Sequence, residues 1–469
     1  MQDNNLDERV IGNESMDSSL LGLPPEILIE ILKLTASDGT PGAAVSPLFL
    51  GRICRNWRDL VFATWAFWQR VNLSINLNYV VQFDLLEEWT RRAGSLPLTL
   101  SVVDRDAVIT GSGSQPSLQR IVQLIQRLAP QISQLTLEMP VVFFDNLEES
   151  GLATYSWSLL SNLHLSTTSV NTNLTNPAKI LDFSSCPNVT SCTIKKFYHS
   201  YIGFPWSSLR HLYFDSVFCT EIYDALKSAT HLETLEARGI VEEGGFSADT
   251  ITQQTLRRLS LSEPTEDECE DCTTLLASLC LPKLTSLIIE LGSAGPSEEF
   301  VFNIQPLISL SKCQLTELSI ENATLQQEVF IQCLSLLPSL RILQVMNIAW
   351  SPTIAVPSAG LEPLLLHRML GTDSKPSLLP NLENLTFVGF TALFSAQVVI
   401  DLLGDRWREL GSGDGSIERS PLHSAIFRLN GQNWVITKEQ EAMFEAWRRR
   451  GYILEVESTD ASYRRPVYQ

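Results

Sequence analysis

The chain has 469 residues and a formal net charge of −19 at pH 7, with 53 Asp and Glu against 34 Lys and Arg. This balance argues against nucleic acid or an anionic membrane as a partner, because both are bound by clustered lysine and arginine. Residues 1–20 are polar and acidic without the apolar core of a signal peptide, and no later stretch approaches roughly eighteen uninterrupted apolar residues. We therefore expect a cytoplasmic or nuclear protein with a disordered acidic tail at 1–20.

The first predicted element is a helix that begins in LPPEILIEIL, residues 23–32. Pro24 and Pro25 suit a first helical turn, where the missing amide donors would be unpaired in any case, and Glu26 complements the positive end of the helix dipole. Two apolar stripes follow at helical spacing: Ile27, Ile31 and Leu34, beside Leu28 and Leu32. This arc is too wide to bury against one small helix, so one stripe is expected to contact something outside the domain.

Two further blocks follow the first helix. ICRNWRDLV occupies 53–61 and Trp68 comes shortly after, beyond a Gly/Pro/Ser-rich connection at 35–51. In this order the three blocks resemble an F-box, with Ile53, Cys54, Trp57 and Arg58 matching the family's V-C-x-x-W-R signature. The connection is somewhat longer than a minimal F-box needs. The alternative is an N-terminal helical hairpin whose leucines and tryptophans form only its own core.

The resemblance implies an all-helical F-box at 21–75 that binds a Skp-family adaptor and, through it, a cullin. The adaptor-binding residues that it implies are Leu23, Pro24, Ile27, Leu28, Ile31, Leu32, Ile53, Cys54, Trp57 and Trp68.

After the F-box, a motif of the form L-x-x-L-x-L recurs at intervals of about 20 to 31 residues, close to the period of leucine-rich repeats. Its last two apolar residues are two apart, which predicts one short parallel strand per repeat, and the segments between have helical spacing. The predicted fold is therefore α/β: an irregular leucine-rich-repeat solenoid over 76–437 with strands on its concave face and helices on its convex face. The motif begins at Ile132, Leu160, Val189, Leu209, Leu232, Leu256, Leu284, Leu315, Leu340 and Leu382.

The repeats depart from the regular pattern after the strand. Where regular leucine-rich repeats often have Asn or Cys, this chain has apolar residues such as Phe197, Val217, Ile240, Ile348 and Phe390. Residues 89–102 predict a helix and strand that join the two domains, and 351–363 and 410–420 predict surface insertions. A helix and strand within 438–469 are expected to cap the C-terminal end.

Outward positions of neighbouring strands should align in space and form a surface. Towards the C-terminal repeats these positions become apolar, and exposed apolar groups often mark a binding site. The predicted target-binding residues are Ile288, Ile342, Gln344, Met346 and Val388, with Glu290, Glu317 and Glu321 beside them favouring a partner with a basic segment. Alternatively, C-terminal elements or insertion loops cover this surface.

Cysteine and glycine motifs give little sign of chemistry. Nine cysteines on a long chain without a signal peptide are expected to be reduced thiols. Cys269 and Cys272 form a C-x-x-C with Cys280 nearby, but no second pair follows and the acidic residues around them disfavour thiolates. We expect an acidic surface loop there and no metal. GSGDGS at 411–416 has no lysine and favours a flexible loop over a phosphate-binding loop.

The histidines do not predict catalysis either. They are far apart in sequence and are expected to be solvent-facing residues on the strand ladder: His164, His199, His211, His231, His367 and His423. We expect no catalytic residue and no cofactor.

These patterns predict a substrate receptor of a Skp–cullin–F-box ubiquitin ligase, in which the repeats bind an unidentified target protein. The receptor would contribute proximity and no catalytic group. One alternative is a Skp-bound scaffold that acts without a cullin. Another is an enzyme built on the repeats, which would need a catalytic set that the sequence does not show.

Overall fold

The computed structural model describes residues 23–36, 46–75, 79–104, 115–168, 180–241, 246–263, 270–292, 302–351, 378–391, 395–408, 422–430 and 434–458. The chain divides into two compact units. The N-terminal unit comprises Met1–Leu73 and Leu77–Ser101, and the C-terminal unit comprises Ser74–Asn76 and Val102–Gln469. The predicted tail at 1–20, the insertion at 410–420, most of the insertion at 351–363, Cys269 and His367 lie outside the described residues.

The described part of the N-terminal unit is mainly helical. Its elements are α1 (Pro25–Ala36), α2 (Pro47–Ile53), α3 (Arg55–Ala63), the 3₁₀ helix η1 (Trp65–Trp68), α4 (Tyr79–Ala93), and most of strands β1 (Arg70–Ser74) and β2 (Leu98–Val103). Ser46 caps α2 by accepting a hydrogen bond from the backbone NH of Leu48 at 3.2 Å. The Cys54 Sγ caps α3 in the same way, accepting from the backbone NH of Trp57 at 3.5 Å. Two short helices can follow each other directly because each start has its own acceptor.

Trp68 forms the centre of this unit. It is 2% exposed, its indole NH donates to the Val61 carbonyl at 3.0 Å, and its ring packs edge-on against Trp89 with centroids 5.1 Å apart. The Arg92 guanidinium lies over the Phe62 ring at 4.6 Å. Through Trp89 and Arg92, helix α4 packs with η1 as part of the N-terminal unit.

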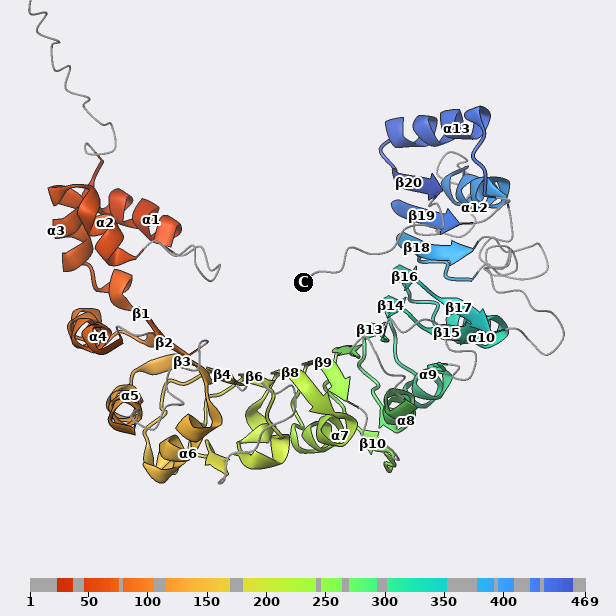
Figure 1. Ribbon diagram of the computed structural model, residues 1–469. Helices are drawn as coiled ribbons and strands as arrows, with labels where there is room; N and C mark the ends of the chain where they lie inside the picture. The colour runs from red at the N-terminus through yellow and green to blue at the C-terminus, as the bar shows by residue number, and fades with distance from the viewer. Residues whose placement is uncertain are drawn as a thin grey trace, which may run out of the picture. The chain divides into compact units, whose positions relative to one another are not determined.

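A long parallel sheet forms the C-terminal unit (Figure 1). Its strand order from β3 onward is β3-β4-β6-β8-β9-β11-β13-β14-β16-β18-β19-β20. The strands are β3 (Ile132–Met139), β4 (Asn162–Thr167), β6 (Ser191–Lys195), β8 (His211–Phe218), β9 (Thr234–Val241), β11 (Arg258–Ser262), β13 (Ser286–Glu290), β14 (Glu317–Glu321), β16 (Ile342–Met346), β18 (Asn384–Thr391), β19 (Ser424–Asn430) and β20 (Ile453–Ser458). Three two-stranded sheets accompany it: β5 (Leu181–Asp182) with β7 (Ile202–Gly203), β10 (Ile251–Thr252) with β12 (Leu279–Cys280), and β15 (Thr324–Gln326) with β17 (Ala349–Ser351).

Helices α5 to α12 lie along one side of this sheet, α13 lies beyond its last strand, β20, and the opposite side, here called the open face, carries none of the unit's described helices (Figure 1). The α-helices are α5 (Gln115–Leu128), α6 (Val141–Glu149), α7 (Cys219–Ser228), α8 (Glu270–Ala277), α9 (Gln305–Ser311), α10 (Gln327–Ser335), α12 (Ala396–Arg408) and α13 (Lys438–Arg449). Short 3₁₀ helices are η3 (Leu152–Thr154), η4 (His199–Tyr201) and η5 (Trp206–Ser208). Helix α13 begins with a capping box between Thr437 and Gln440, and its Trp447 packs edge-on against Trp407 of α12 at 4.8 Å.

The apolar ladder of the sheet follows the sequence motif. The middle apolar residue of each motif pairs with its counterpart on the next strand, and all of them are buried: Leu135, Leu163, Cys192, Leu212, Leu235, Leu259, Leu287, Leu318, Leu343 and Leu385. The backbone carbonyl just before many strands accepts hydrogen bonds from two consecutive amides at the start of the next strand. The carbonyl of Arg210, for example, accepts from the amides of Glu233 and Thr234 at 2.8 and 2.9 Å. The prediction of a mixed α/β fold with one parallel strand per motif is confirmed.

A residue with left-handed backbone follows many of the strands and changes the direction of the chain. Six such residues directly follow the outward residue that ends the regular part of a strand: Lys196, Ser216, Gly239, Asn322, Asn347 and Gly389, with φ between 52° and 83°. After Val388 the pairing register shifts by one, as in a bulge. The next residue then returns to the core, and Phe197, Val217 and Ile240 are buried. This turn explains the apolar residues that the sequence places after the strand.

Two of these turns carry asparagine at the left-handed position. Asn322 donates through Nδ2 to the Leu291 carbonyl at 3.1 Å, and Asn347 donates to Oδ1 of Asn322 at 3.2 Å. These asparagines lie one residue before the position that regular repeats often fill with Asn or Cys, and that position itself is apolar here, as at Ile348. They satisfy backbone and side-chain groups at the turns.

Candidate functional site

Helix α1 presents its two apolar stripes to different surroundings. Leu28 and Leu32 are buried, whereas Ile27 is 50% and Leu34 73% exposed. Ile31, between these two on the outer stripe, is partly exposed. Because residues three and four apart share one helix face, the outer stripe forms a continuous apolar strip. The side chains of this strip are exposed or partly exposed, as expected of a stripe that contacts something outside the domain.

The neighbouring helices add further exposed apolar side chains. Phe49 in α2 is 58% exposed, Ile53 at its end 52%, and Trp65 in η1 58%, while Leu48 is exposed to a smaller extent. Several large exposed apolar groups on one small unit are typical of an interaction surface. Sequence reasoning missed Leu48, Phe49 and Trp65. The connection that the sequence predicts at 35–51 includes PLFLG, residues 47–51, which form the start of α2.

The predicted adaptor-binding residues fall into three classes of exposure. Pro24, Ile27 and Ile53 are exposed, and Leu23, Ile31, Cys54 and Trp57 are partly exposed. Leu28, Leu32 and Trp68 are buried. These three side chains pack inside the N-terminal unit, so in this structure they hold the fold and are not presented at its surface.

The open face is formed by alternate residues of the strands. In β11 and β16 the first, third and fifth residues point outward and the second and fourth are buried. The predicted target-binding residues, Ile288, Ile342, Gln344, Met346 and Val388, all occupy such outward positions and are partly exposed. Met346 and Val388 are direct neighbours in register. None of the described helices of the C-terminal unit covers these residues.

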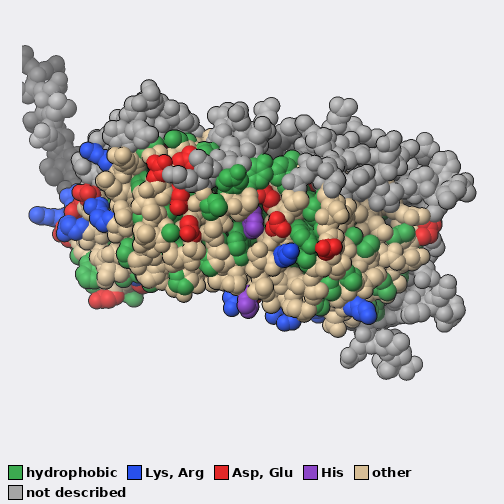
Figure 2. Space-filling view, turned by 90° about the horizontal axis from the view of Figure 1, so that it is seen from below, with side chains coloured by type: hydrophobic (Ala, Val, Ile, Leu, Met, Phe, Trp, Pro, Cys, Tyr) green, Lys and Arg blue, Asp and Glu red, His purple; other side chains and the backbone are tan. Residues whose placement is uncertain are grey.

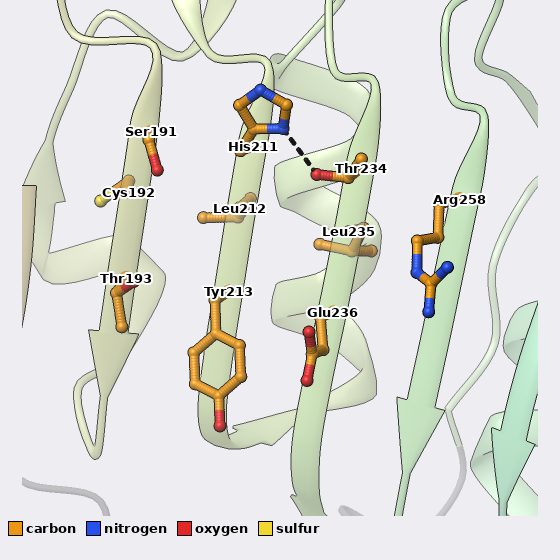
Figure 3. A pocket seen from close by; sticks show the side chains of 10 residues that line it. All are labelled: Ser191, Cys192, Thr193, His211, Leu212, Tyr213, Thr234, Leu235, Glu236 and Arg258. Carbon is orange, nitrogen blue, oxygen red and sulfur yellow. Dashed lines mark hydrogen bonds between the residues drawn. The ribbon is translucent and has the colours of Figure 1, made fainter. Parts of the chain in front are cut away.

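Tyr213 stands in a shallow depression of about 240 Å³ on the open face across β6, β8, β9 and β11 (Figure 3). Lys195 Nζ and Arg238 Cζ approach its ring to 5.7 and 5.9 Å from the centroid. Arg238 is also paired with Glu236 at 2.8 Å. Partial burial, followed by the negative charge of Asp215, raises the pKa of the Tyr213 phenol. The phenol therefore stays protonated and can donate a hydrogen bond in this depression.

Polar groups line the rest of this depression (Figure 3). His211 Nδ1 lies 2.8 Å from Thr234 Oγ1, and Arg258 Nη1 contacts Glu317 at 3.4 Å. Ser191 and Thr193 add hydroxyl groups from β6. Tyrosine beside arginine is a combination enriched at the centres of protein interfaces. Sequence reasoning did not single out Tyr213, because no spacing rule marks a depression across four strands.

The histidines do not form one ladder. His164 and His211 lie on strands of the sheet, whereas His199 lies in η4 and its ring packs at a tilt against Trp206 with centroids 4.2 Å apart. His231 precedes β9 and its Nδ1 contacts the Ser207 carbonyl at 2.9 Å. The prediction that all histidines are solvent-facing ladder residues is therefore wrong for His199, whereas His231 and His423 are exposed but lie before β9 and β19 and not in these strands.

The described part of the helical side carries charged side chains of both signs. Figure 2 looks onto the helical side of the middle repeats, where acidic and basic side chains are dispersed among hydrophobic and other polar ones. Exposed large apolar residues there, such as Leu310 and Leu336, are separate positions on different elements. Dispersed residues of this kind are ordinary for a protein surface.

Among the described residues there is no group of three or more His, Cys, Asp or Glu side chains arranged to hold a metal ion. Within the same part of the chain, no helix combines the length and apolar character needed to cross a membrane. Comparison with protein-family models and with curated proteins finds no match for this sequence. The candidate sites are thus two surfaces, the exposed apolar surface of the N-terminal unit and the open face of the C-terminal unit.

Proposed function

We propose that this chain is an F-box substrate receptor, whose N-terminal unit binds a Skp-family adaptor and whose C-terminal unit binds a target protein. The observation that carries the proposal is the division of α1 into a buried stripe at Leu28 and Leu32 and an exposed stripe at Ile27, Ile31 and Leu34. The exposed stripe, together with Phe49 and Ile53, offers an apolar surface of the kind that a helical adaptor covers.

The C-terminal unit supports the second half of the proposal. Its sheet repeats one strand per motif with a shared register, the arrangement expected of a leucine-rich-repeat solenoid. Such repeats present aligned outward side chains over many strands, and here these side chains include Tyr213, Met346 and Val388. A target protein held there would be brought near a charged ubiquitin-conjugating enzyme, so the receptor would act by raising effective concentration.

Co-expression with a Skp-family adaptor tests the first half. The wild-type chain should co-purify with the adaptor, and Ile27→Asp together with Phe49→Asp should abolish this, because unpaired carboxylates would be buried in the contact. Leu159→Asp is the matched control: Leu159 is an exposed apolar residue of the C-terminal unit, and this variant should bind like wild type. Circular dichroism should show that all variants are folded. A wild-type chain that fails to bind the adaptor would overturn the proposal.

Cullin in the same purification distinguishes the two functions that an adaptor-binding chain can have. A ligase receptor should recover a cullin together with the adaptor, and the Ile27→Asp, Phe49→Asp variant should lose both. Recovery of the adaptor without any cullin would favour a scaffold that uses the adaptor alone.

A further inference from the structure

The depression on the open face is lined by polar side chains from four strands. Two rows of register partners form it: Ser191, His211, Thr234 and Arg258 in the first row, and Thr193, Tyr213 and Glu236 in the second. The His211 and Tyr213 rings point in opposite directions along β8, away from the space between the two rows (Figure 3). A guest side chain would therefore find room between these rings.

The charged groups in this lining each have an oppositely charged partner. Glu236 is paired with Arg238 at 2.8 Å, and Arg258 contacts Glu317 at 3.4 Å. Arg238 also acts electrostatically on Glu290. A charged guest would lose its hydration without gaining an unmatched counter-charge, so this lining disfavours acidic and basic guests alike.

Ion pairing leaves hydrogen-bonding capacity at both lining residues. Arg238 contacts Oε1 of Glu236 through Nε at 2.9 Å and Nη2 at 2.8 Å, although a carboxylate has two oxygens that accept. In the described part of the chain, Arg258 donates to Glu317 through Nη1 alone, although a guanidinium has five N–H donors. The site thus offers an acceptor on β9 and donors on the adjacent strand β11.

Arg258 extends along β11 from the row of Thr234 towards the row of Glu236 (Figure 3). Adjacent strands are about 4.8 Å apart, a separation that one small planar group can bridge. The depression, at about 240 Å³, is smaller than the roughly 300–1,000 Å³ of sites that bind drug-sized molecules. Its size therefore suits one side chain of a protein.

Hydroxyl groups border the depression on the side of β6. Ser191 and Thr193 both line it and are partly exposed, and neither hydroxyl has a hydrogen-bond partner among the described residues. A hydroxyl both donates and accepts, so these two groups can bond the backbone of a segment that carries the guest side chain.

We propose that this depression receives one uncharged amide side chain, asparagine or glutamine, from a segment of the target protein. The guest N–H would donate to Glu236 and its carbonyl would accept from Arg258, with the Tyr213 ring as a wall of the site. An amide fits because it carries an acceptor and two donors on one carbon. The inference rests on the proposed function, because it names the type of residue that the receptor recognises in its target.

A peptide selection tests the inference. Random peptides of about twelve residues, displayed on phage, are selected on the immobilised full-length chain, and the affinity of enriched peptides is measured by fluorescence anisotropy. Enriched sequences should share an asparagine or a glutamine. Replacing a shared glutamine by methionine, or a shared asparagine by leucine, should weaken binding about tenfold or more, because Glu236 and Arg258 would be covered without a partner.

Variants of the chain locate the guest. Glu236→Gln and Arg258→Gln should each weaken peptide binding about fivefold or more. Arg428→Gln is the matched control, since Arg428 also lies on the open face and donates to Glu455 at 2.9 Å; it should leave binding within about twofold. Circular dichroism should show that all variants are folded.

A double-mutant cycle links the two partners directly. The loss caused by the peptide substitution and the loss caused by Arg258→Gln should overlap and not add, because both remove the same hydrogen bond. The inference fails if no peptide is enriched, if the enriched peptides share a charged residue and no amide, or if the two losses add in full.

The selection is performed without adaptor, and the Arg258→Gln variant should still co-purify with the adaptor. Failure of the peptide selection with intact adaptor binding would therefore reject this inference alone. Loss of adaptor binding in the wild-type chain would instead reject the proposed function.

Discussion

Asn347 donates a hydrogen bond of 3.2 Å to Asn322 from the next strand turn, and both residues have left-handed backbone, with φ of 52° and 58°. Asparagine is among the few non-glycine residues that adopt this conformation readily, and its amide can bridge to the neighbouring turn. The following turn has Gly389, with φ of 83°. A Cβ at residue 389 would lie 2.2 Å from Oδ1 of Asn347. The asparagine pair therefore requires a glycine beside it.

Gly389→Ala should destabilise the protein by about 2 kcal/mol or more, because it combines an unfavourable φ with a contact that forces Asn347 to move. The shift in the midpoint of urea unfolding measures the effect. Gly451→Ala is the matched control, since Gly451 also has a positive φ, 93°, but a Cβ there would meet nothing within 4 Å. This control should cost only about 1 kcal/mol. Equal losses would show that contact with Asn347 has no energetic weight.

Asn347→Gly should lower stability by roughly 0.5–1.5 kcal/mol, because glycine keeps the left-handed backbone but removes the hydrogen bonds to Asn322 and Glu321. Asn347→Ala should cost more, since it also introduces backbone strain. Both are measured by urea unfolding against wild type. A glycine variant as stable as wild type would mean that the side-chain hydrogen bonds of Asn347 contribute no net free energy.

The strands could be predicted because the signal is local. A motif such as Leu284, Leu287 and Ile289 places two apolar residues at the strand period, and burial of Leu287 at the register position of Leu259 and Leu318 follows from repeating it. The left-handed turns could also have been found, since Gly or Asn recurs at a fixed offset after Glu321, Met346 and Val388. This Gly or Asn lies one residue before the apolar residue that follows each strand, such as Ile348 or Phe390.

The sites were less predictable because they depend on exposure and on several strands at once. A sequence shows that α1 has two stripes, but packing around Trp68 determines that Leu28 faces inward and Ile27 outward. The depression at Tyr213 needs β6, β8, β9 and β11 side by side, with Arg258 of β11 among the residues that line it. No single segment carries that information.

Stability should fall as pH decreases through the ordinary histidine pKa of 6.5. Burial lowers the pKa of His199, whose Nε2 is buried without a hydrogen-bond partner. The unfolded chain then binds a proton more readily than the folded chain, so the contribution is complete above 6.5 and is lost at lower pH.

The melting temperature, compared at about pH 7.5 and about pH 5.5, checks this sign. The drop should be smaller in His199→Gln than in wild type, while His231→Gln, at an exposed position outside the strands, should behave like wild type. A wild-type protein that becomes more stable on acidification, with the opposite change in His199→Gln, would contradict the assignment.

Buried thiols should resist alkylation in the folded protein. Burial raises the pKa of Cys186 and Cys333 to about 12 and that of Cys192 further, so little thiolate forms. Among the described cysteines, Cys54 and Cys280 are partly exposed. Iodoacetamide labelling followed by mass spectrometry should modify these two before the buried thiols. Early modification of Cys192 would show that the sheet core opens.

The two stripes of α1 should respond differently to substitution. Leu28→Asp is expected to unfold the N-terminal unit, since it buries a carboxylate in the core beside Leu32, and it therefore cannot test binding. Ile27→Asp replaces a half-exposed side chain and should leave the melting temperature nearly unchanged. Only the second variant separates contact with a partner from folding.

Isothermal titration of a purified Skp-family adaptor into wild-type and Ile27→Asp chains tests the account most directly. We expect the folded Ile27→Asp variant to bind at least about a hundredfold more weakly than wild type, equivalent to about 2.7 kcal/mol. Equal affinity of the two folded chains for the adaptor would contradict the claim that the outer stripe of α1 is the adaptor-binding surface.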